Sequence, residues 1–286
     1  MIQLREYQVN LSKEGASILR HNGIVYLAME VRTGKTLVSL TIANIMQAKS
    51  VLFVTKKRAM SSIQNDFDAI GYTYNLDIIN YESLHKVTDT DYDIIIVDET
   101  HSIGAFPKPS LRAKRLKKLF TRGTGMIALS GTPTPESYSQ MYHQLWVSPY
   151  SPFKDYKNFY SFAKEFVDVQ ERFLGSIRVK DYSFAYKDLI IPLIQPLMIT
   201  YSQKQANFKN TIEEIVINIK MNAFTKEYIE TLLSDRVLEI RDNGRYDVIL
   251  GDTGVKLQNK IHQLNSGTVK TEDGVGLIID RTKAAY

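Results

Sequence analysis

The first half of the chain alternates short, nearly continuous apolar runs with amphipathic stretches. Apolar runs of this length are typical of strands buried on both faces, and the amphipathic stretches between them are typical of covering helices. The alternation therefore predicts an α/β fold with a parallel sheet and helices on both faces. The expected strands are Ile24–Met29, Val51–Thr55, Asp77–Asn80, Asp93–Val97 and Met126–Ser130, and the expected helices are Lys35–Gln47, Met60–Ile70, Leu111–Phe120 and Glu136–Trp146.

After Pro149 the pattern changes. Aromatic residues and lysines crowd Phe153–Phe166, a polar and mixed stretch follows to about Lys187, and a helical pattern returns at Phe224–Ile240. The tail beyond it is Gly-rich and weakly patterned. We therefore predict a sheet-bearing domain over residues 1–148, a smaller and mostly helical extension packed on it over 149–220, and connecting helices over 221–286.

Composition excludes several classes of protein and site. The chain has no cysteine, so it forms neither disulfides nor thiolate metal sites. Its net charge of +5 permits a polyanionic partner without demonstrating one. The charged N-terminus is unlike a secretory signal, and the longest apolar run, Leu189–Ile199, is short and interrupted by Pro192, Gln195 and Pro196. We expect a cytoplasmic protein without a membrane partner.

The strand at Ile24–Met29 leads through a short loop into a helix that begins at Gly34-Lys35-Thr36. Loop amides and a helix N-terminus bind phosphate, a lysine adds a mobile cation, and a threonine hydroxyl can coordinate Mg²⁺. The full phosphate-loop pattern has Gly where this chain has Met29. An ordinary strand–turn–helix is the alternative interpretation, which a second strand carrying carboxylates disfavours.

The strand at Asp93–Val97 provides that second feature, because it ends in the adjacent acids Asp98 and Glu99. Both acids are expected at the carboxyl edge of the sheet, beside the phosphate loop. There Asp98 would hold Mg²⁺, and Glu99 would orient and deprotonate the attacking water. Taken with Gly-Lys-Thr, the pair predicts a nucleoside triphosphate site. The alternative is a strand followed by a solvated acidic turn.

Four segments in order resemble the superfamily-two DExH helicases, in particular the Swi/Snf-type translocases and their compact phage versions. These are the segments that resemble the adenine-reading motif, motif I, motif II and motif III: Leu4-Arg5-Glu6-Tyr7-Gln8, Ala28–Thr36, Asp98-Glu99-Thr100-His101 and Ser130-Gly131-Thr132-Pro133. The resemblance implies a RecA-like lobe that binds ATP and Mg²⁺ and drives movement on DNA. Weaker similarity covers the motif Ia region and the extension between lobes.

The resemblance also assigns roles to residues. It implies that Gln8 reads adenine and that Ser130 and Thr132, with His101, couple the nucleotide state to nucleic-acid contact. The complete candidate set comprises catalytic Lys35, Asp98 and Glu99; ATP-binding Gln8, Arg32, Thr33, Gly34, Lys35 and Thr36; Mg²⁺-binding Thr36 and Asp98; coupling His101, Ser130 and Thr132; and nucleic-acid-binding Lys56, Lys57 and Arg58.

The sequence departs from the family in three places. Arg32 stands where Swi/Snf proteins usually have Gly, and Thr200–Lys204 replaces a basic doublet. Nothing after Ile240 resembles motifs IV to VI, so the arginine of motif VI is expected from a second RecA-like lobe downstream. The resemblance implies DNA, single-stranded or duplex, as a partner, and a role in phage DNA replication or recombination alongside replication proteins. We expect this lobe alone to hydrolyse ATP weakly or not at all.

Two questions stay open at this stage. A basic stretch between Gly104 and Thr124 is either a solvated helix face, with Leu111, Leu116, Leu119 and Phe120 inward, or a phosphate-backbone contact. The chain as a whole is either a translocase lobe or a nucleotide-binding interaction module that does not translocate. A small-molecule P-loop kinase is disfavoured, because the motif III segment would be unexplained. The basic residues of the stretch are Lys108, Arg112, Lys114, Arg115, Lys117, Lys118 and Arg122.

Overall fold

The computed structural model describes residues 3–88, 91–174, 177–206, 221–242 and 245–281. The chain divides into two compact units, which are described separately: residues 1–169 with 182–211, and residues 170–181 with 212–286. Most of the expected extension at 149–220 therefore belongs to the same unit as the sheet. Its last part, 207–220, lies outside the described residues.

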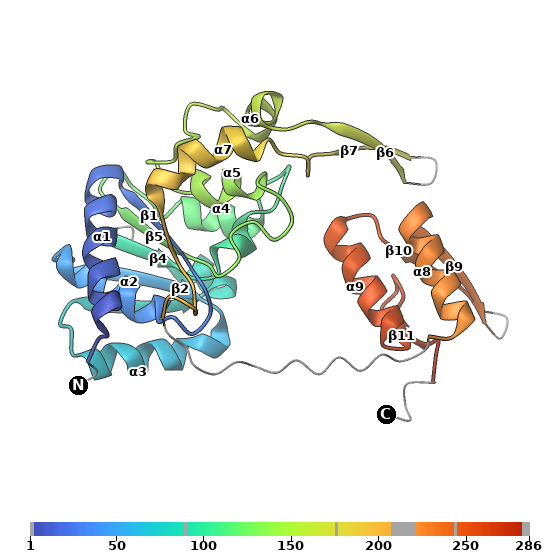
Figure 1. The fold of residues 1–286 in the computed structure, drawn as a ribbon, viewed down its shortest axis with the longest axis horizontal. Coiled ribbons are helices and arrows are strands. Elements are labelled where there is room, and N and C mark those ends of the chain that lie inside the picture. The colour runs from blue at the N-terminus through green and yellow to red at the C-terminus, as the bar shows by residue number, and fades with distance from the viewer. Residues whose placement is uncertain (1–2, 89–90, 175–176, 207–220, 243–244, 282–286) are drawn as a thin grey trace. The chain divides into compact units, whose positions relative to one another are not determined.

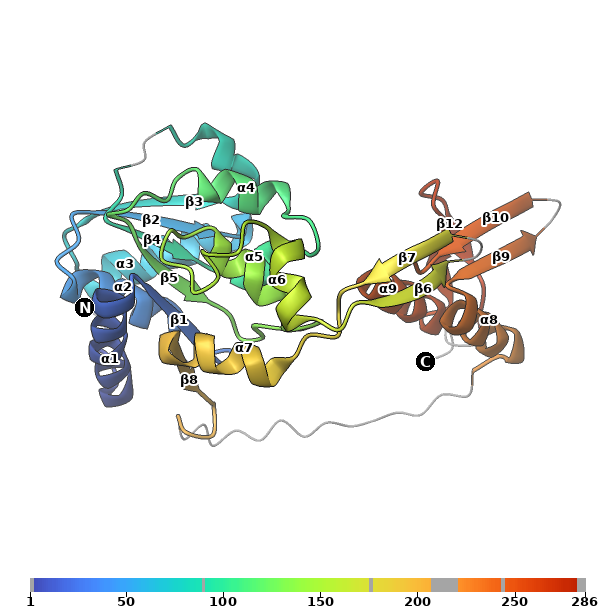
Figure 2. The ribbon, with the colours of Figure 1, turned by 90° about the horizontal axis from the view of Figure 1, so that it is seen from above.

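The first unit (Figure 1) is built on a six-stranded sheet with the order β3-β2-β4-β5-β1-β8, whose strands are all labelled in Figure 2. Every neighbouring pair in this sheet is parallel. The five strands expected from the sequence are all present, so the prediction of a parallel α/β sheet is confirmed. The strands are β1 (Ile24–Met29), β2 (Ser50–Thr55), β3 (Asn75–Asn80), β4 (Ile94–Val97), β5 (Gly125–Leu129) and β8 (Met198–Tyr201).

The sequence pattern did not predict β8. This strand returns from the aromatic segment to the sheet and pairs with β1, Leu27 lying opposite Ile199. It has four residues and directly follows a 3₁₀ turn that contains Pro196. A short edge strand pairs on one side only, so it lacks the continuous apolar run that marks the central strands.

Alternate residues of the central strands enter two separate cores. In β1, Val25 and Leu27 pack with α1, α2 and α3, whereas Ile24 and Tyr26 pack with α4 to α7. This two-sided burial explains why the central strands are apolar throughout. Figure 2 shows the same helices from a second direction. The helices are α1 (Glu6–Asn22), α2 (Lys35–Ile45), α3 (Met60–Ile70), α4 (Leu111–Lys117), α5 (Gln140–Trp146), α6 (Phe159–Phe166) and α7 (Lys187–Ile194).

The aromatic segment after Pro149 forms part of the first unit's core. Tyr142 on α5 lies 4.9 Å from the Phe162 ring and 5.6 Å from that of Phe159, measured between ring centroids. Phe153 and Phe162 are 5.0 Å apart, in an edge-to-face arrangement. Such pairs stabilise a core beyond the area they bury. The crowding of aromatics in this segment is therefore explained by packing.

In its described residues, the second unit combines short strands with the helices α8 and α9. Its core joins Leu232 on α8 and Leu264 on α9 with residues of the strands, such as Ile249. The expected helix over Phe224–Ile240 is wrong at its end: α8 stops at Asp235, and Arg236 adopts a left-handed conformation with φ 62°. The elements are β6 (Gln170–Leu174), β7 (Ile177–Asp181), α8 (Ala223–Asp235), β9 (Val237–Asp242), β10 (Arg245–Leu250), α9 (Gly254–Asn265), β11 (Thr268–Lys270) and β12 (Gly276–Ile278).

A strand starts where this helix stops because β9 pairs antiparallel with β10. A pairing of this kind overrides the local helical pattern that 237–240 continues.

Among the described residues, no helix has both the length and the apolar character needed to cross a bilayer.

Candidate functional site at the carboxyl edge of the sheet

The phosphate-loop segment joins β1 to α2. Gly34 precedes the first residue of α2 and has φ 83°, a left-handed conformation that suits glycine. A Cβ atom at this position would lie 2.1 Å from Nε2 of Gln8. The backbone angle therefore favours glycine at residue 34, within the loop predicted to bind phosphate, and a larger residue would also have to displace the Gln8 amide.

Arg32 takes the place of the glycine that Swi/Snf proteins carry in this loop. Its φ of 63° is also left-handed, a conformation that suits glycine. Thr33 is buried, and its hydroxyl donates to the Glu30 carbonyl oxygen at 2.7 Å. The Tyr7 hydroxyl donates to the Thr33 carbonyl oxygen at 3.1 Å. The first bond closes the loop on itself directly after β1, and the second fastens it to α1.

Lys35 lies at the start of α2 and reaches back across the loop. Its Nζ donates to the carbonyl oxygens of Met29 at 2.8 Å and Glu30 at 3.0 Å. Burial lowers the pKa of the Lys35 ammonium group, an effect opposed by the carboxylates of Asp98 and Glu99. Thr36, the next residue, is half-buried in the same first turn.

The two acids lie at the end of β4, next to the end of β2. The Thr55 hydroxyl donates to Oδ2 of Asp98 at 2.7 Å, and the Glu99 amide donates to Oδ1 at 2.9 Å. Burial raises the pKa of the Asp98 carboxyl group, while the Thr55 bond opposes this. Asp98 is therefore a carboxylate fixed at both oxygens in a partly dry setting, where a cation stabilises its charge.

Glu99 has a backbone conformation that is rare for a residue with a side chain. Its φ is 49° and its ψ is 46°. Oε1 lies 3.4 Å from Nζ of Lys56, and Oε2 lies 3.5 Å from Nδ1 of His101. Left-handed residues of this kind cluster at functional sites, where the surroundings offset the strain. The carboxylate of Glu99 is thus held between two basic side chains.

The three residues predicted to couple nucleotide and nucleic acid lie together. Nδ1 of His101 is 2.9 Å from the Ser130 hydroxyl oxygen, which also accepts a hydrogen bond from the Thr132 amide at 3.1 Å. A Cβ on the intervening Gly131 would lie 3.8 Å from Nζ of Lys35. The end of β5 is therefore linked to Glu99 through His101 and lies beside the phosphate-loop lysine.

Sequence reasoning missed two threonines of this edge. Thr55 contacts Asp98, as described above. Thr100 is fully buried, and its hydroxyl donates to the Val97 carbonyl oxygen at 2.6 Å and accepts from the Leu129 amide at 3.1 Å. It thereby ties the end of β4 to the end of β5. Thr100 lies within the segment that resembles motif II and Thr55 ends an expected strand, but only the strand order shows which groups their hydroxyls contact.

Gln8 lies on α1 against the phosphate loop. It is 5% exposed, and its Oε1 accepts a hydrogen bond from the Arg5 amide at 2.9 Å, which caps the helix. Beside it, the ring of Tyr7 stacks on that of Tyr201 at 4.7 Å between centroids. Gln8 thus has a structural role in this arrangement, and recognition of adenine by its amide stays a prediction.

The candidate nucleic-acid residues follow β2. Lys57 and Arg58 are exposed on the 3₁₀ helix η1 (Lys57–Ala59), and Lys56 caps that helix. They form a run of three cations at the carboxyl edge. A run of this kind on a surface suits a phosphate backbone.

The basic stretch on α4 has a mixed arrangement. Nζ of Lys117 donates to the Trp146 carbonyl oxygen at 2.7 Å and lies 3.9 Å from the centre of its ring. Arg112 donates to Glu82 at 2.6 Å. Leu116 is buried as expected, but the inward orientation predicted for Leu111 is wrong, because that side chain is 62% exposed. At least two of the cations thus have protein partners, which favours the helix-face interpretation for them.

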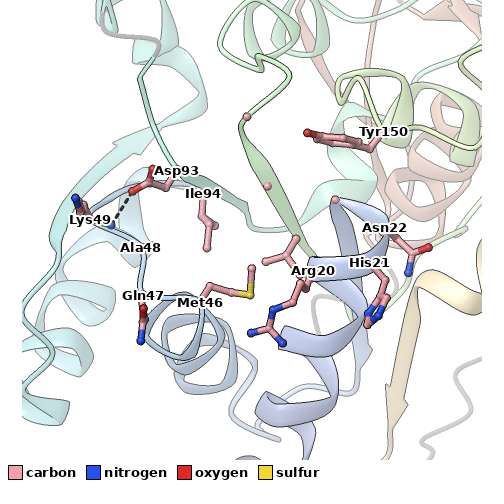
Figure 3. Close-up of a pocket in the computed structure, with 14 residues that line it drawn as sticks. Arg20, His21, Asn22, Met46, Gln47, Ala48, Lys49, Asp93, Ile94 and Tyr150 are labelled. Atoms are coloured by element: carbon pink, nitrogen blue, oxygen red, sulfur yellow. Dashed lines mark hydrogen bonds between the residues drawn. The ribbon is translucent and has the colours of Figure 1, made fainter.

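A cavity of about 510 Å³ lies at the opposite, amino edge of the sheet. The ends of α1 and α2 and the starts of β4 and β5 surround it, and Tyr150 closes one side (Figure 3). Asp93 borders it and accepts hydrogen bonds from the amides of Lys49 and Ser50 at 2.6 and 3.1 Å. Its lining residues do not include the candidate residues of the carboxyl edge. This cavity is thus separate from the predicted chemistry.

The donor set at the carboxyl edge fits Mg²⁺ bound together with a triphosphate. Mg²⁺ in such sites takes one or two protein oxygens and completes its shell with phosphate and water oxygens. Asp98 supplies a carboxylate after β4, and Thr36 supplies a hydroxyl in the first turn of α2, after β1. In the described part of the chain, no group of three or more His, Asp or Glu side chains forms a metal cage. An ion that brings its own phosphate ligands needs no such cage.

Comparison with known proteins gives a consistent family and fold. Residues 44–273 match the SNF2-related domain. The fold is similar to a SWI2/SNF2 ATPase core from Sulfolobus solfataricus solved with double-stranded DNA, with a TM-score of 0.57 and 16% identity over 82% of this chain. The chain spans 53% of the length of that protein. A search of curated proteins gives no match.

Two further solved structures match smaller parts of the chain. They are the Type ISP restriction-modification enzymes LlaGI, as a nuclease-deletion mutant with a DNA substrate mimic, and LlaBIII, bound to DNA. LlaGI has a TM-score of 0.33 and 15% identity, covering 46% of this chain and 18% of its own. LlaBIII has a TM-score of 0.32 and 15% identity, covering 45% of this chain and 13% of its own.

Proposed function

The chain belongs to the SNF2-related domain family, and from this premise we propose that it is the first motor lobe of an ATP-dependent DNA translocase. One observation carries the proposal. The carboxyl ends of β1, β4 and β5 bring Lys35, the Asp98–Glu99 pair and Ser130 to a single edge of the sheet. In open α/β sheets, this edge is where ligands bind.

Each group has a role in binding ATP and activating water. The amides of the phosphate loop and the N-terminus of α2 receive the phosphates, and Lys35 exchanges its bonds to the loop carbonyls for phosphate oxygens. Asp98 and Thr36 would hold Mg²⁺, which when bound neutralises charge on the phosphates. Glu99 accepts a proton from the attacking water. His101, which is hydrogen-bonded to Ser130, lies against Oε2 of the Glu99 carboxylate.

Turnover requires a further cation on the outer side of the γ-phosphate. In related phosphoryl-transfer systems, an arginine supplied from outside the phosphate loop raises turnover about 10³–10⁵-fold. We infer that a second RecA-like lobe supplies it here. The role of Gln8 at the adenine, and a role in phage replication or recombination, follow from the resemblance and stay predictions.

The test is the ATPase rate of residues 1–286 and of a longer chain that includes downstream sequence, with and without DNA. We expect weak turnover for the first and DNA-stimulated turnover, higher by orders of magnitude, for the second. Glu99→Gln in the longer chain should lose turnover and keep ATP binding. An interaction module without translocation would instead bind ATP and show no stimulation by DNA in either chain.

Contact with DNA is tested separately through its salt dependence. Because the exposed cations read the backbone alone, the affinity should not depend on sequence. It should fall with a slope of log K against log salt of about 0.7–0.9 per phosphate contacted. An affinity that is independent of salt, or selective for one sequence, would contradict this part of the proposal.

A further inference from the structure

Two consecutive residues at the end of β2 contact the two acids at the end of β4. The strands are parallel neighbours, with Val54 opposite Val97. The residues that follow therefore run side by side: the Thr55 hydroxyl donates to Asp98 at 2.7 Å, and Nζ of Lys56 lies 3.4 Å from Oε1 of Glu99. The register of the sheet thus places Lys56, which is predicted to bind nucleic acid, beside Glu99, which is predicted to activate water.

The pair between Lys56 and Glu99 is placed where it can be exchanged. The Lys56 side chain is 44% exposed and that of Glu99 is 36% exposed. Ion pairs at such exposure are weak, because water and salt screen them. Lys57 and Arg58 follow directly and are exposed, so a phosphate that approaches these cations also approaches Lys56.

We propose that Lys56 is shared between Glu99 and a phosphate of the nucleic-acid backbone, so that binding of nucleic acid at the end of β2 releases Glu99. The inference rests on the proposed function, since it takes Glu99 as the residue that activates water. While Lys56 donates to Oε1, that oxygen is occupied by an ammonium group rather than by water. A phosphate that captures Lys56 returns the oxygen to the nucleotide site.

The other groups around Glu99 are arranged to keep it in place during this exchange. His101 lies 3.5 Å from Oε2 and is itself held by Ser130. Glu99, with its left-handed backbone, lies between β4 and η3 (Thr100–Ile103) as the N-cap residue of η3. Loss of Lys56 therefore changes which partner one oxygen has and leaves the residue at the site. Lys56 acts as a positioning residue for Glu99.

Linkage makes the proposal testable without hydrolysis. If Glu99 and phosphate compete for Lys56, removal of the Glu99 charge must strengthen DNA binding, and only through Lys56. The measurement is a double-mutant cycle on Glu99 and Lys56. A fluorescein-labelled DNA duplex of mixed sequence is titrated with each variant of residues 1–286 without nucleotide, and its anisotropy gives the Kd. We expect Glu99→Gln to lower the Kd about twofold to fivefold, the change that a half-exposed ion pair supports.

Glu99→Gln is combined with variants of Lys56 and Lys57 to separate competition for Lys56 from a general effect of the Glu99 charge. In Lys56→Met, Glu99→Gln should leave the Kd unchanged, whereas in Lys56→Arg the strengthening should return. Lys57→Met is the matched control: it removes one cation from the same 3₁₀ helix, so binding weakens, yet Glu99→Gln should still strengthen it.

Two results of the binding cycle would overturn the inference in different ways. If Glu99→Gln strengthens binding equally in the wild-type and Lys56→Met backgrounds, only the long-range charge matters and the sharing of Lys56 is wrong, while the proposed function stands. If no variant binds the duplex, the proposed DNA contact fails as well.

In a longer and active chain, Lys56→Met should raise kcat without DNA about twofold to fivefold and leave the KM for ATP unchanged, in line with the loss of one half-exposed ion pair. A change in KM alone would also contradict the inference.

Discussion

The two edges of the six-stranded sheet differ in what they hold. At the carboxyl edge, Lys35 contacts the last residue of β1, Asp98 contacts the last residue of β2, and Glu99 contacts Lys56, which follows β2. At the amino edge, a cavity of about 510 Å³ opens beside Asp93, and its walls carry none of the motif residues. Volume alone would therefore point to the wrong edge. Polar groups that converge from several strands identify the site better.

The largest expected difference between the edges is in ATP binding. Lys35→Ala removes a cation from the phosphate loop and should weaken binding of ATP–Mg²⁺ by about 10- to 100-fold, as expected for a charge-assisted contact. Lys49→Ala, an exposed lysine that lines the amino-edge cavity, should leave the affinity unchanged. Isothermal titration of both variants measures this. Equal affinities for Lys35→Ala and wild type would place the nucleotide elsewhere.

A substitution at the amino edge should affect stability and leave ATP binding unchanged. Asp93 accepts two amide hydrogen bonds at the start of β2, so Asp93→Ala should lower the free energy of unfolding by about 1–1.5 kcal/mol. ATP affinity should stay the same, because Asp93 lies at the amino edge, away from the phosphate loop. Urea unfolding and the same titration test both halves. A loss of ATP affinity without a loss of stability would mean that the amino edge takes part in the nucleotide site.

A pH effect should arise from the carboxyl-edge side. Nδ1–H of His143 donates to the Ala105 carbonyl oxygen at 2.7 Å, two residues after η3 ends, and burial lowers the pKa of His143 to about 4. Because the folded pKa is below the unfolded value of about 6.5, the unfolded chain binds more protons between the two values. The stability contributed by neutral His143 is complete above about pH 6.5 and is lost as the pH falls toward 4.

The expected loss of unfolding free energy between about pH 7.5 and 5.5 is about 1 kcal/mol. Urea unfolding at the two pH values measures it. His143→Gln, which cannot take up the proton, should show a smaller difference between them. An identical pH dependence in the variant would assign the effect to other groups.

The smallest expected effect compares left-handed residues at the two edges. Arg32 in the phosphate loop and Gln47 after α2 have φ of 63° and 58°. Replacement by glycine should relieve about 0.5–1 kcal/mol of backbone strain at either position. Only Arg32→Gly should also change ATP affinity, and by less than Lys35→Ala. Melting temperatures and titrations of the two variants give the comparison, and destabilisation by Arg32→Gly would show that the arginine side chain itself fastens the loop.

Much of the first unit follows from the sequence by itself. The five expected strands lie within two residues of the observed ends. Four of them are central strands of a parallel sheet, which must be apolar on both faces, whereas β3 lies at the edge. Helix α3 has the expected bounds, Met60–Ile70. The order of motifs also placed Asp98 and Ser130 at strand ends and Lys35 at the start of the helix that follows a strand. Once the strands are parallel, these residues must share one edge.

The tertiary structure decided what local pattern could not. Strand β8 lies at the edge of the sheet, and residues 237–240 leave the helix because β9 pairs with β10, a contact that the local pattern does not report. The same holds at the site, where the contact of Lys56 with Glu99 depends on β2 and β4 being adjacent and in register. A sequence states which residues end each strand, but strand order and register, set by packing of the whole core, decide which of those residues touch.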